Sequence, residues 1–187
     1  EKHIQILVHH NLKKHDIYKA AHHPKLVIRS GTTELFSFAK QNNIPVIIFS
    51  ASGIGTDSID FFLEKNNLLT DNIFTVSNRL EYKNNVVTGF TYPLIHGLNK
   101  NESILRYFPK AQKALLERKS VLLFGDSPSD TEMVEDKNHG LIIRIGVCNE
   151  IGKKKKKQVL PLFQEKFDIV IENDEGLESI CDLIIKN

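Results

Sequence analysis

The sequence predicts an α/β fold with a mostly parallel sheet flanked by helices, and two observations carry that prediction. Short apolar runs of strand type alternate with segments of helical periodicity over most of the 187 residues. The run at 44–49 is continuous and rich in β-branched residues, as is typical of a strand that is covered on both faces. Such alternation implies parallel strands joined by crossover connections.

The composition describes a globular chain with a core, because 41% of the residues are apolar and 26% are charged. The net charge of +2 is small, and part of the positive charge lies in one lysine run at 153–157. A nucleic-acid partner is therefore not expected, because it would need a broader basic face. No apolar run has transmembrane length and no signal-peptide pattern occurs, so we expect no membrane partner. The only cysteines, Cys148 and Cys181, are far apart, which favours a reducing, cytoplasmic compartment.

Residues 1–27 are expected to be helical, because their apolar side chains recur at helical spacing. Six of the eight histidines also lie in this segment: His3, His9, His10, His15, His22 and His23. A metal-binding cluster is one interpretation. A solvated helical face is favoured, because no cysteine or carboxylate pattern accompanies the histidines.

From Gly31 the alternation begins. Helices are expected at 32–42, 57–66 and 99–107, after Pro128, and at 177–185. Strands are expected at 44–49, 73–76, 121–124, 141–145 and 168–171. The segment 82–92 predicts a hairpin that turns at Asn84-Asn85. The lysine run is expected to be a solvated helix or loop, with contact to a polyanion as the other interpretation.

The acidic stretch at 121–130 is the part of the sequence most suggestive of chemistry. An apolar strand ends abruptly in Gly125-Asp126, and Asp130 follows four residues later. Carboxylates at the carboxyl end of a strand lie where open α/β sheets bind ligands. Their oxygens suit a divalent cation. The alternative is an aspartate N-cap followed by an ordinary turn and helix.

Two further polar positions complete a candidate site. Ser50 follows the strand at 44–49 and precedes glycine-rich backbone. This pattern is typical of an anion cradle or of a plain turn. Lys100 lies between two asparagines at an expected helix start, and alone it reads as a surface lysine. Together with Asp126 and Asp130 they suit phosphoryl transfer. The hydroxyl and the amine would hold phosphate oxygens, and the acids would hold Mg²⁺.

These residues resemble a known family. Phe49-Ser50-Ala51, Lys100 and Gly125-Asp126-Ser127-x-x-Asp130 resemble motifs II, III and IV of the haloacid-dehalogenase-like (HAD) phosphatases. The closer resemblance is to the cytosolic pyrimidine 5′-nucleotidases, the UMP/CMP phosphohydrolases. It is carried, in order, by segments 43–51, 73–78, 94–101, 123–133 and 167–171. The family's fold implies a Rossmann-like HAD core.

The resemblance also implies roles for the matching residues. Ser50 and the backbone at Ala51 would bind the transferred phosphate. Lys100 would bind the same phosphate and neutralise the nucleophile. Asp126 would ligate Mg²⁺, and Asp130 would act through water or orient that ligand shell.

The chain also departs from the family. The family's first motif is Asp-x-Asp, whose first aspartate is the nucleophile, and no Asp-x-Asp precedes Ser50 here. We therefore expect the nucleophile upstream of this chain. Residues 1–27 would be the C-terminal part of a helical cap, and 28–187 a core that lacks the motif I strand. The loop at 50–55 is also one residue longer than the family's usual loop.

The resulting hypothesis is Mg²⁺-dependent hydrolysis of pyrimidine nucleoside 5′-monophosphates, UMP and CMP, through an aspartyl-phosphate intermediate. One alternative keeps the fold but acts on another small phosphomonoester, such as phosphoserine. A second is a non-catalytic module that binds nucleotide or phosphate. A third is a structural domain with a fortuitous pair of aspartates. The sequence gives no expectation for the oligomeric state.

Overall fold

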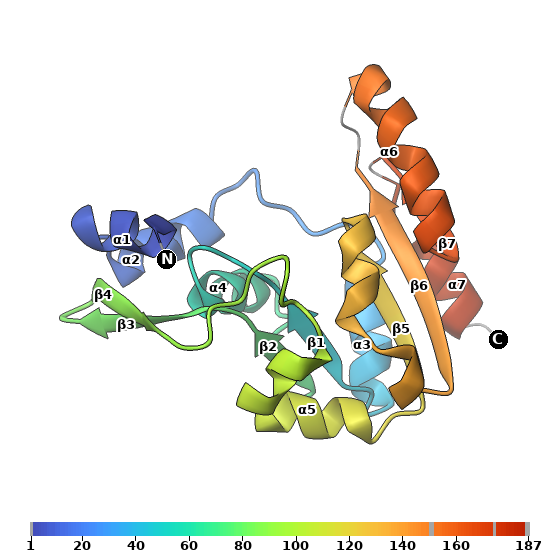
Figure 1. Cartoon of the computed structure of the whole chain (residues 1–187), viewed down its shortest axis with the longest axis horizontal. Helices are drawn as coiled ribbons and strands as arrows, with labels where there is room; N and C mark the ends of the chain where they lie inside the picture. Colours follow the sequence, from blue (N-terminus) through green and yellow to red (C-terminus); the bar gives the residue numbers. More distant parts are fainter. Residues whose placement is uncertain (1, 150–151, 174, 186–187) are drawn as a thin grey trace.

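The computed structural model describes residues 2–149, 152–173 and 175–185. Helices flank short parallel strands, and a two-stranded hairpin projects from one side (Figure 1). This architecture confirms the predicted α/β fold.

The N-terminal segment forms two helices, α1 (Lys2–His9) and α2 (Lys14–Ala21), where one helix was expected. The helix breaks at Asn11, whose φ of 52° is left-handed. The chain then runs beside the hairpin, where the Val87 amide donates to the Leu12 carbonyl at 2.8 Å. Pairing with a strand therefore replaces one turn of helix.

The other predicted elements lie close to their expected positions. They are α3 (Thr32–Gln41), β1 (Val46–Phe49), α4 (Thr56–Lys65), β2 (Ile73–Val76), β3 (Arg79–Lys83), β4 (Val86–Thr91), β5 (Ser120–Gly125), β6 (Leu141–Cys148), β7 (Ile169–Glu172) and α7 (Glu178–Ile185). The helix α6 (Gly152–Lys166) begins at the lysine run, which was expected to be a helix or a loop, and extends beyond it. The hairpin turn at Asn84-Asn85 is confirmed, with both residues at positive φ.

Two predictions around the site were wrong in helix type, and one helix was missed. The helices expected at 99–107 and after Pro128 are the 3₁₀ helices η1 (Glu102–Tyr107) and η2 (Pro128–Met133). The helix α5 (Pro109–Leu116) was not predicted. Its Pro109 occupies the first helical turn, where a missing amide hydrogen costs nothing. A short 3₁₀ helix, η3 (Asp136–Asn138), precedes β6.

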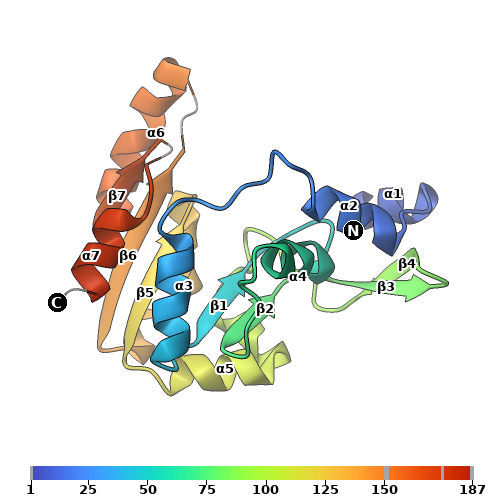
Figure 2. The ribbon, with the colours of Figure 1, turned by 180° about the vertical axis from the view of Figure 1, so that it is seen from behind.

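The parallel strands form two groups, β1–β2 and β5–β6–β7. Both views place them in the order β2, β1, β5, β6, β7 (Figures 1 and 2). The Arg118 guanidinium donates to the Asn43 carbonyl at 2.7 Å, which ties together the chain segments that enter β5 and β1. The two groups therefore begin at the same end of the molecule.

The strands alternate between two covered faces, as their period of two requires. In β6, Ile145 packs with Ile180 of α7 and Leu35 of α3. The next residue, Gly146, faces α6, where an added Cβ would lie 2.7 Å from rings of Phe163 and Phe167. Helices α3 and α7 thus cover one face of this group and α6 covers the other, which explains the continuous apolar runs.

The lysine run at 153–157 lies within α6, and Lys157 is exposed. Side chains at 153–156 are outside the described part of the chain. No helix among the described residues is long and apolar enough to cross a membrane. Cys148 and Cys181 are both buried free thiols.

Candidate active site

Gly125, the last residue of β5, determines how residues 126–130, here called the acidic loop, pack. A Cβ added to Gly125 would lie 2.6 Å from the Cβ of Asp130 and 3.1 Å from Cζ of Phe167. Only glycine lets Asp130 approach the strand end this closely. The turn itself is short because Pro128 opens η2 and the Asp130 amide donates to the Ser127 carbonyl at 2.9 Å.

Asp130 is the centre of the hydrogen-bond network. The residue is 5% exposed. Its Oδ1 accepts from the Lys100 ammonium at 2.8 Å, and its Oδ2 accepts from the amides of Asp126 at 3.0 Å and Ser127 at 3.1 Å. Both oxygens are thus engaged by donors of this chain. That arrangement suits an orienting role for Asp130 better than direct ligation of a metal.

Asp126 is the exposed member of the acid pair. Partial desolvation raises the pKa of its carboxyl, and the negative charge of Asp130 raises the pKa further. The positive charge of Lys100 acts in the opposite direction and lowers it. Ionised Asp126 is therefore in an unfavourable environment that a bound cation would improve.

Lys100 lies on an irregular segment that is braced by neighbouring side chains. Asn99 accepts from the His96 amide and donates to the Leu94 carbonyl, both at 2.8 Å. Asn101 caps η1 by accepting from the Ser103 amide at 3.1 Å. The lysine side chain is 18% exposed. Lys100 therefore forms a largely buried ion pair with Asp130 and is not an ordinary surface lysine.

Ser50 stands at the carboxyl end of β1. Its amide donates to the Val76 carbonyl at 2.9 Å, which continues the pairing of β1 with β2. Ser50 is half-buried and Ala51 is exposed. The loop ends at Gly55, whose φ of 80° is left-handed, and α4 begins at the next residue. The loop therefore leads directly to a helix N-terminus, as an anion cradle requires.

A buried asparagine joins this loop to the lysine segment. The Asn78 amide nitrogen donates to the carbonyls of Ser52 at 3.0 Å and Ile95 at 3.1 Å, and its oxygen accepts from the Ile95 amide at 2.7 Å. The Asn78 carbonyl accepts from the Thr56 amide at 2.7 Å. The structure thus connects the Ser50 loop to the Lys100 segment, and Lys100 to the acids.

The N-terminal helices reach the same loop. A Cβ added to Gly53 would lie 2.5 Å from Nε2 of His3 in α1. Farther out, Lys14 of α2 pairs with Asp57 of α4 at 2.9 Å, and the Tyr82 hydroxyl donates to Asp57 at 2.6 Å. These helices therefore pack on α4 and the hairpin, with α1 over the loop after Ser50.

The acid pair offers oxygen ligands, which fit Mg²⁺ chemically. Within the described ranges, however, no three or more His, Cys, Asp or Glu side chains gather to hold a metal ion, and this includes the histidine-rich helices. Asp126 is the available ligand, since Asp130 is engaged elsewhere. The residues fit a magnesium site that needs at least one ligand from outside the described residues.

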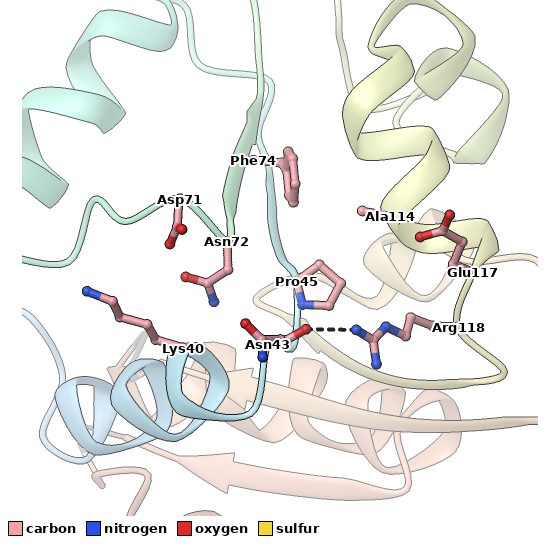
Figure 3. A pocket seen from close by; sticks show the side chains of 9 residues that line it. All are labelled: Lys40, Asn43, Pro45, Asp71, Asn72, Phe74, Ala114, Glu117 and Arg118. Atoms are coloured by element: carbon pink, nitrogen blue, oxygen red, sulfur yellow. Dashed lines mark hydrogen bonds between the residues drawn. The ribbon is translucent and has the colours of Figure 1, made fainter.

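A pocket of about 260 Å³ lies at the opposite end of the strands (Figure 3). Its lining includes Asn43 and Pro45 before β1, Asn72 before β2, and Arg118 before β5. The dashed contact in Figure 3 is the bond between Arg118 and Asn43. The pocket is therefore not part of the candidate site.

Sequence reasoning missed three buried side chains that make hydrogen bonds around the candidate site: Asn78, which joins the Ser50 loop to the Lys100 segment, and Glu102 and His139, which contact each other at 3.1 Å. Asn78 lies in one of the segments that carry the family resemblance, but its sequence neighbours do not indicate its partners. Glu102 and His139 are 37 positions apart and meet only in the folded chain. No sequence pattern connects them.

Comparison with known proteins agrees with this geometry. The family model described as pyrimidine 5′-nucleotidase (UMPH-1) matches residues 1–186. A 7-methylguanosine phosphate-specific 5′-nucleotidase of Gallus gallus is 31% identical over 96% of this chain, and a putative cytosolic 5′-nucleotidase 3 of Caenorhabditis elegans is 29% identical over 96%. The chain covers only 61% and 48% of those two relatives.

A solved structure of cytosolic 5′-nucleotidase IIIB bound to cytidine is also similar. It superposes with a TM-score of 0.73 at 28% sequence identity, over 92% of this chain and 56% of that protein. The family match spans almost the whole chain, and the shared fold agrees with it. The chain belongs to the pyrimidine 5′-nucleotidase (UMPH-1) family, as its resemblance predicts.

Proposed function

We propose that this chain is part of a Mg²⁺-dependent enzyme that hydrolyses nucleoside 5′-monophosphates to nucleoside and phosphate. The observation that carries the proposal is the Lys100–Asp130–Asp126 network at the end of β5. Asn78 links that network to the Ser50 loop. A cation, an exposed acid and an anion cradle are the parts that phosphoryl transfer needs.

Each residue has a distinct role in this proposal. The Ser50 hydroxyl and the Ala51 amide hold phosphate oxygens, and Lys100 offsets their negative charge. Asp126 holds Mg²⁺, and Asp130 keeps both Lys100 and the loop amides in place. The bound ion would neutralise and orient the phosphoryl oxygens.

The proposed nucleophile is an aspartate upstream of Glu1. Its carboxylate would attack phosphorus while the bond to the nucleoside 5′-oxygen breaks, and that oxygen would take a proton from a second upstream acid. Water would then hydrolyse the acyl phosphate and restore the carboxylate. The partial coverage of the relatives supports this proposal, since it leaves room for such a segment.

The strand pairing offers further support. Among the described strands, β1 pairs with β2 and β5 pairs with β6, so each keeps one edge without a partner strand. These strands are neighbours in the order seen in Figures 1 and 2, and Phe49 of β1 packs in the same cluster as Leu123 of β5. We infer that an upstream parallel strand pairs with both edges and presents the nucleophile beside Ser50 and Asp126.

We likewise infer that residues 1–27 are the end of a cap domain and that 28–187 are the core. The extended chain from 22 to 31 separates α2 from α3 (Figure 1). The contact of His3 with Gly53 supports a cap that covers the Ser50 loop. A cap of this kind would exclude water from the bound phosphate.

The comparisons favour two classes of substrate. The family description and the cytidine-bound structure support UMP and CMP. The name of the Gallus gallus relative instead supports 7-methylguanosine monophosphate. We propose pyrimidine nucleotides first, and the methylated purine nucleotide as the second candidate. A cytosolic relative also supports a cytoplasmic location.

The test is phosphate release by the complete polypeptide from UMP, CMP, 7-methylguanosine monophosphate, AMP and phosphoserine, with Mg²⁺ and with chelator. We expect turnover of a nucleotide only with Mg²⁺. Lys100→Ala and Asp126→Asn should each reduce turnover at least 100-fold, and Glu117→Ala, which removes an exposed carboxylate, should not.

The same assay on residues 1–187 alone tests the upstream nucleophile. We expect no turnover from this chain. Normal turnover by Lys100→Ala or Asp126→Asn would contradict the site. Turnover confined to phosphoserine would replace nucleotides by another phosphomonoester.

A further inference from the structure

Glu102 is a buried carboxylate that the proposed chemistry does not use. The residue is 8% exposed. Its Oε1 accepts from the Glu135 amide at 2.6 Å and lies 3.1 Å from Nε2 of His139, and its Oε2 accepts from the Asn138 side chain at 2.5 Å. All three partners lie in the connection between η2 and β6. One side chain thus fixes that connection at three points.

Its position relates this contact to the candidate site. Glu102 lies two residues after Lys100, at the start of η1. Lys100 pairs with Asp130 inside η2, and Glu102 binds the segment from Glu135 to His139 that follows η2. The lysine segment is therefore joined to this part of the chain twice, once within η2 and once after it.

His139 is the fully buried partner of Glu102. Its side chain is fully buried, with Nδ1 3.0 Å from the Arg118 carbonyl and Nε2 facing Glu102. Both partners are acceptors, so a protonated ring donates to both of them and a neutral ring donates to one. A buried carboxylate is costly unless such donors surround it.

Packing alone does not require a carboxylate here. The apolar residues of η1, Ile104 and Leu105, already anchor the helix in the core beside Val76. Buried ion pairs are often no more stabilising than apolar replacements. What the carboxylate adds is directional bonding, which sets the distance between two segments.

We propose that Glu102 is a positioning residue that holds Lys100 and the acidic loop in register for phosphate binding. The inference rests on the proposed function, because that function gives Lys100 its role. The contact itself is independent of catalysis, so its effect on Lys100 is measurable without turnover.

The experiment uses the complete polypeptide with Glu102→Ala and Glu102→Gln. Glu117→Ala is the matched control, because it removes an exposed carboxylate that pairs with Lys113. The first readout is the rate of reductive methylation of the Lys100 amine by formaldehyde and borane, mapped by mass spectrometry. Exposed Lys19 is the internal reference. The second readout is kcat and KM for UMP.

In Glu102→Ala we expect the methylation of Lys100 relative to Lys19 to rise about tenfold, as for the loss of hydrogen bonds to a charged group. We expect kcat/KM for UMP to fall by a similar factor. Glu102→Gln should be intermediate, because one oxygen acceptor remains. Glu117→Ala should leave both readouts unchanged.

Unchanged Lys100 reactivity in a folded Glu102→Ala protein would overturn the proposal. If that variant does not fold, Glu102→Gln decides by the same comparison. A rise in Lys100 reactivity in a protein whose wild type releases no phosphate would support the positioning role and overturn the proposed function. The two failures are therefore distinguishable.

Discussion

The acidic loop after β5 and the serine loop after β1 are built in opposite ways. In the acidic loop, Asp130 is buried and bonded to Lys100 and two amides, and Gly125 packs against its Cβ. In the serine loop, Ala51 is exposed, and Gly53 faces the ring of His3, which is itself exposed. One loop is fixed by buried charged groups of the chain, and the other is held by neutral hydrogen bonds and leaves Ala51 exposed.

In the proposed function, this difference gives the acidic loop and the serine loop different roles. Charges that act on a developing transition state are most effective when they are already in place, because no reorganisation is then needed. A cradle that must admit and release phosphate gains from a looser surround. We therefore expect substitutions in the acidic loop to change stability, and substitutions in the serine loop to change substrate binding.

The largest expected effect is that of Asp130→Ala. It leaves Lys100 without its counter-ion and two amides without an acceptor, so the free energy of unfolding should fall by about 3 kcal/mol. Urea unfolding of the chain measures this fall. Exposed Glu117→Ala should change it by about 0.5 kcal/mol or less. A loss below about 1 kcal/mol for Asp130→Ala would contradict the fixed character of the acidic loop.

A matched pair of glycine substitutions compares the two loops directly. Gly125→Ala would bring a Cβ to 2.6 Å from the Cβ of buried Asp130, and relief requires movement of the loop. We expect a loss of about 2 kcal/mol in unfolding free energy. Gly53→Ala meets only the ring of exposed His3, which can rotate away, so its loss should stay near ~0.5 kcal/mol. Equal losses of unfolding free energy in the two variants would contradict the difference between the acidic and serine loops.

This contrast also explains what the sequence could and could not predict. The strands were predictable because burial on both faces produces continuous apolar runs, as in β1 and in residues 121–124 of β5. Ser50, Asp126 and Asp130 became candidates because residue type, position after a strand and family resemblance agreed. Lys100 became one through its place at an expected helix start and through the resemblance. Their placement at one connected site is a property of the folded chain.

The rest depends on tertiary contacts that leave no local pattern. Asn78 and Glu102 have polar neighbours in the sequence, so nothing local marks them as buried. Only folding brings Asn78 to Ile95 and Glu102 to His139. The break after α1 has the same origin, because Leu12 leaves the helix to pair with β4. The helix α5 was not expected, although its Pro109 is of the kind that favours the first helical turn.

Ser50→Ala tests the serine loop with a smaller expected effect. The half-buried hydroxyl should bind phosphate oxygen, so its loss should raise KM for UMP about tenfold, as for one hydrogen bond to a charged group. The unfolding free energy should change by no more than about 0.5 kcal/mol. Steady-state kinetics of the complete polypeptide measure the first effect. Ser120→Ala, an exposed position at the start of β5, is the control.

An unchanged KM for Ser50→Ala would assign phosphate binding to backbone groups alone. A large loss of stability would show that the serine loop is as fixed as the acidic one.

The smallest expected effect is a gain of stability from Asp126→Asn. Desolvation, and after it the charge of Asp130, raises the pKa of Asp126 above its ordinary value of 3.8, so ionisation costs more in the folded chain than in the unfolded chain. The wild type therefore loses stability as the pH rises through the raised pKa. Because Asp126 is exposed, solvent screening limits the gain in the variant to about 0.5 kcal/mol at neutral pH.

The sign of this effect separates it from every other substitution in the acidic loop. The advantage of Asp126→Asn should shrink as the pH falls towards the ordinary aspartate value, where the wild-type carboxyl is also neutral. Urea unfolding at several pH values without divalent cation measures it. Added Mg²⁺ should stabilise the wild type and not the variant, because only the carboxylate attracts the ion. A variant that is less stable than the wild type at neutral pH would show that ionised Asp126 already has favourable partners in the loop, and that a cation is not needed to hold it there.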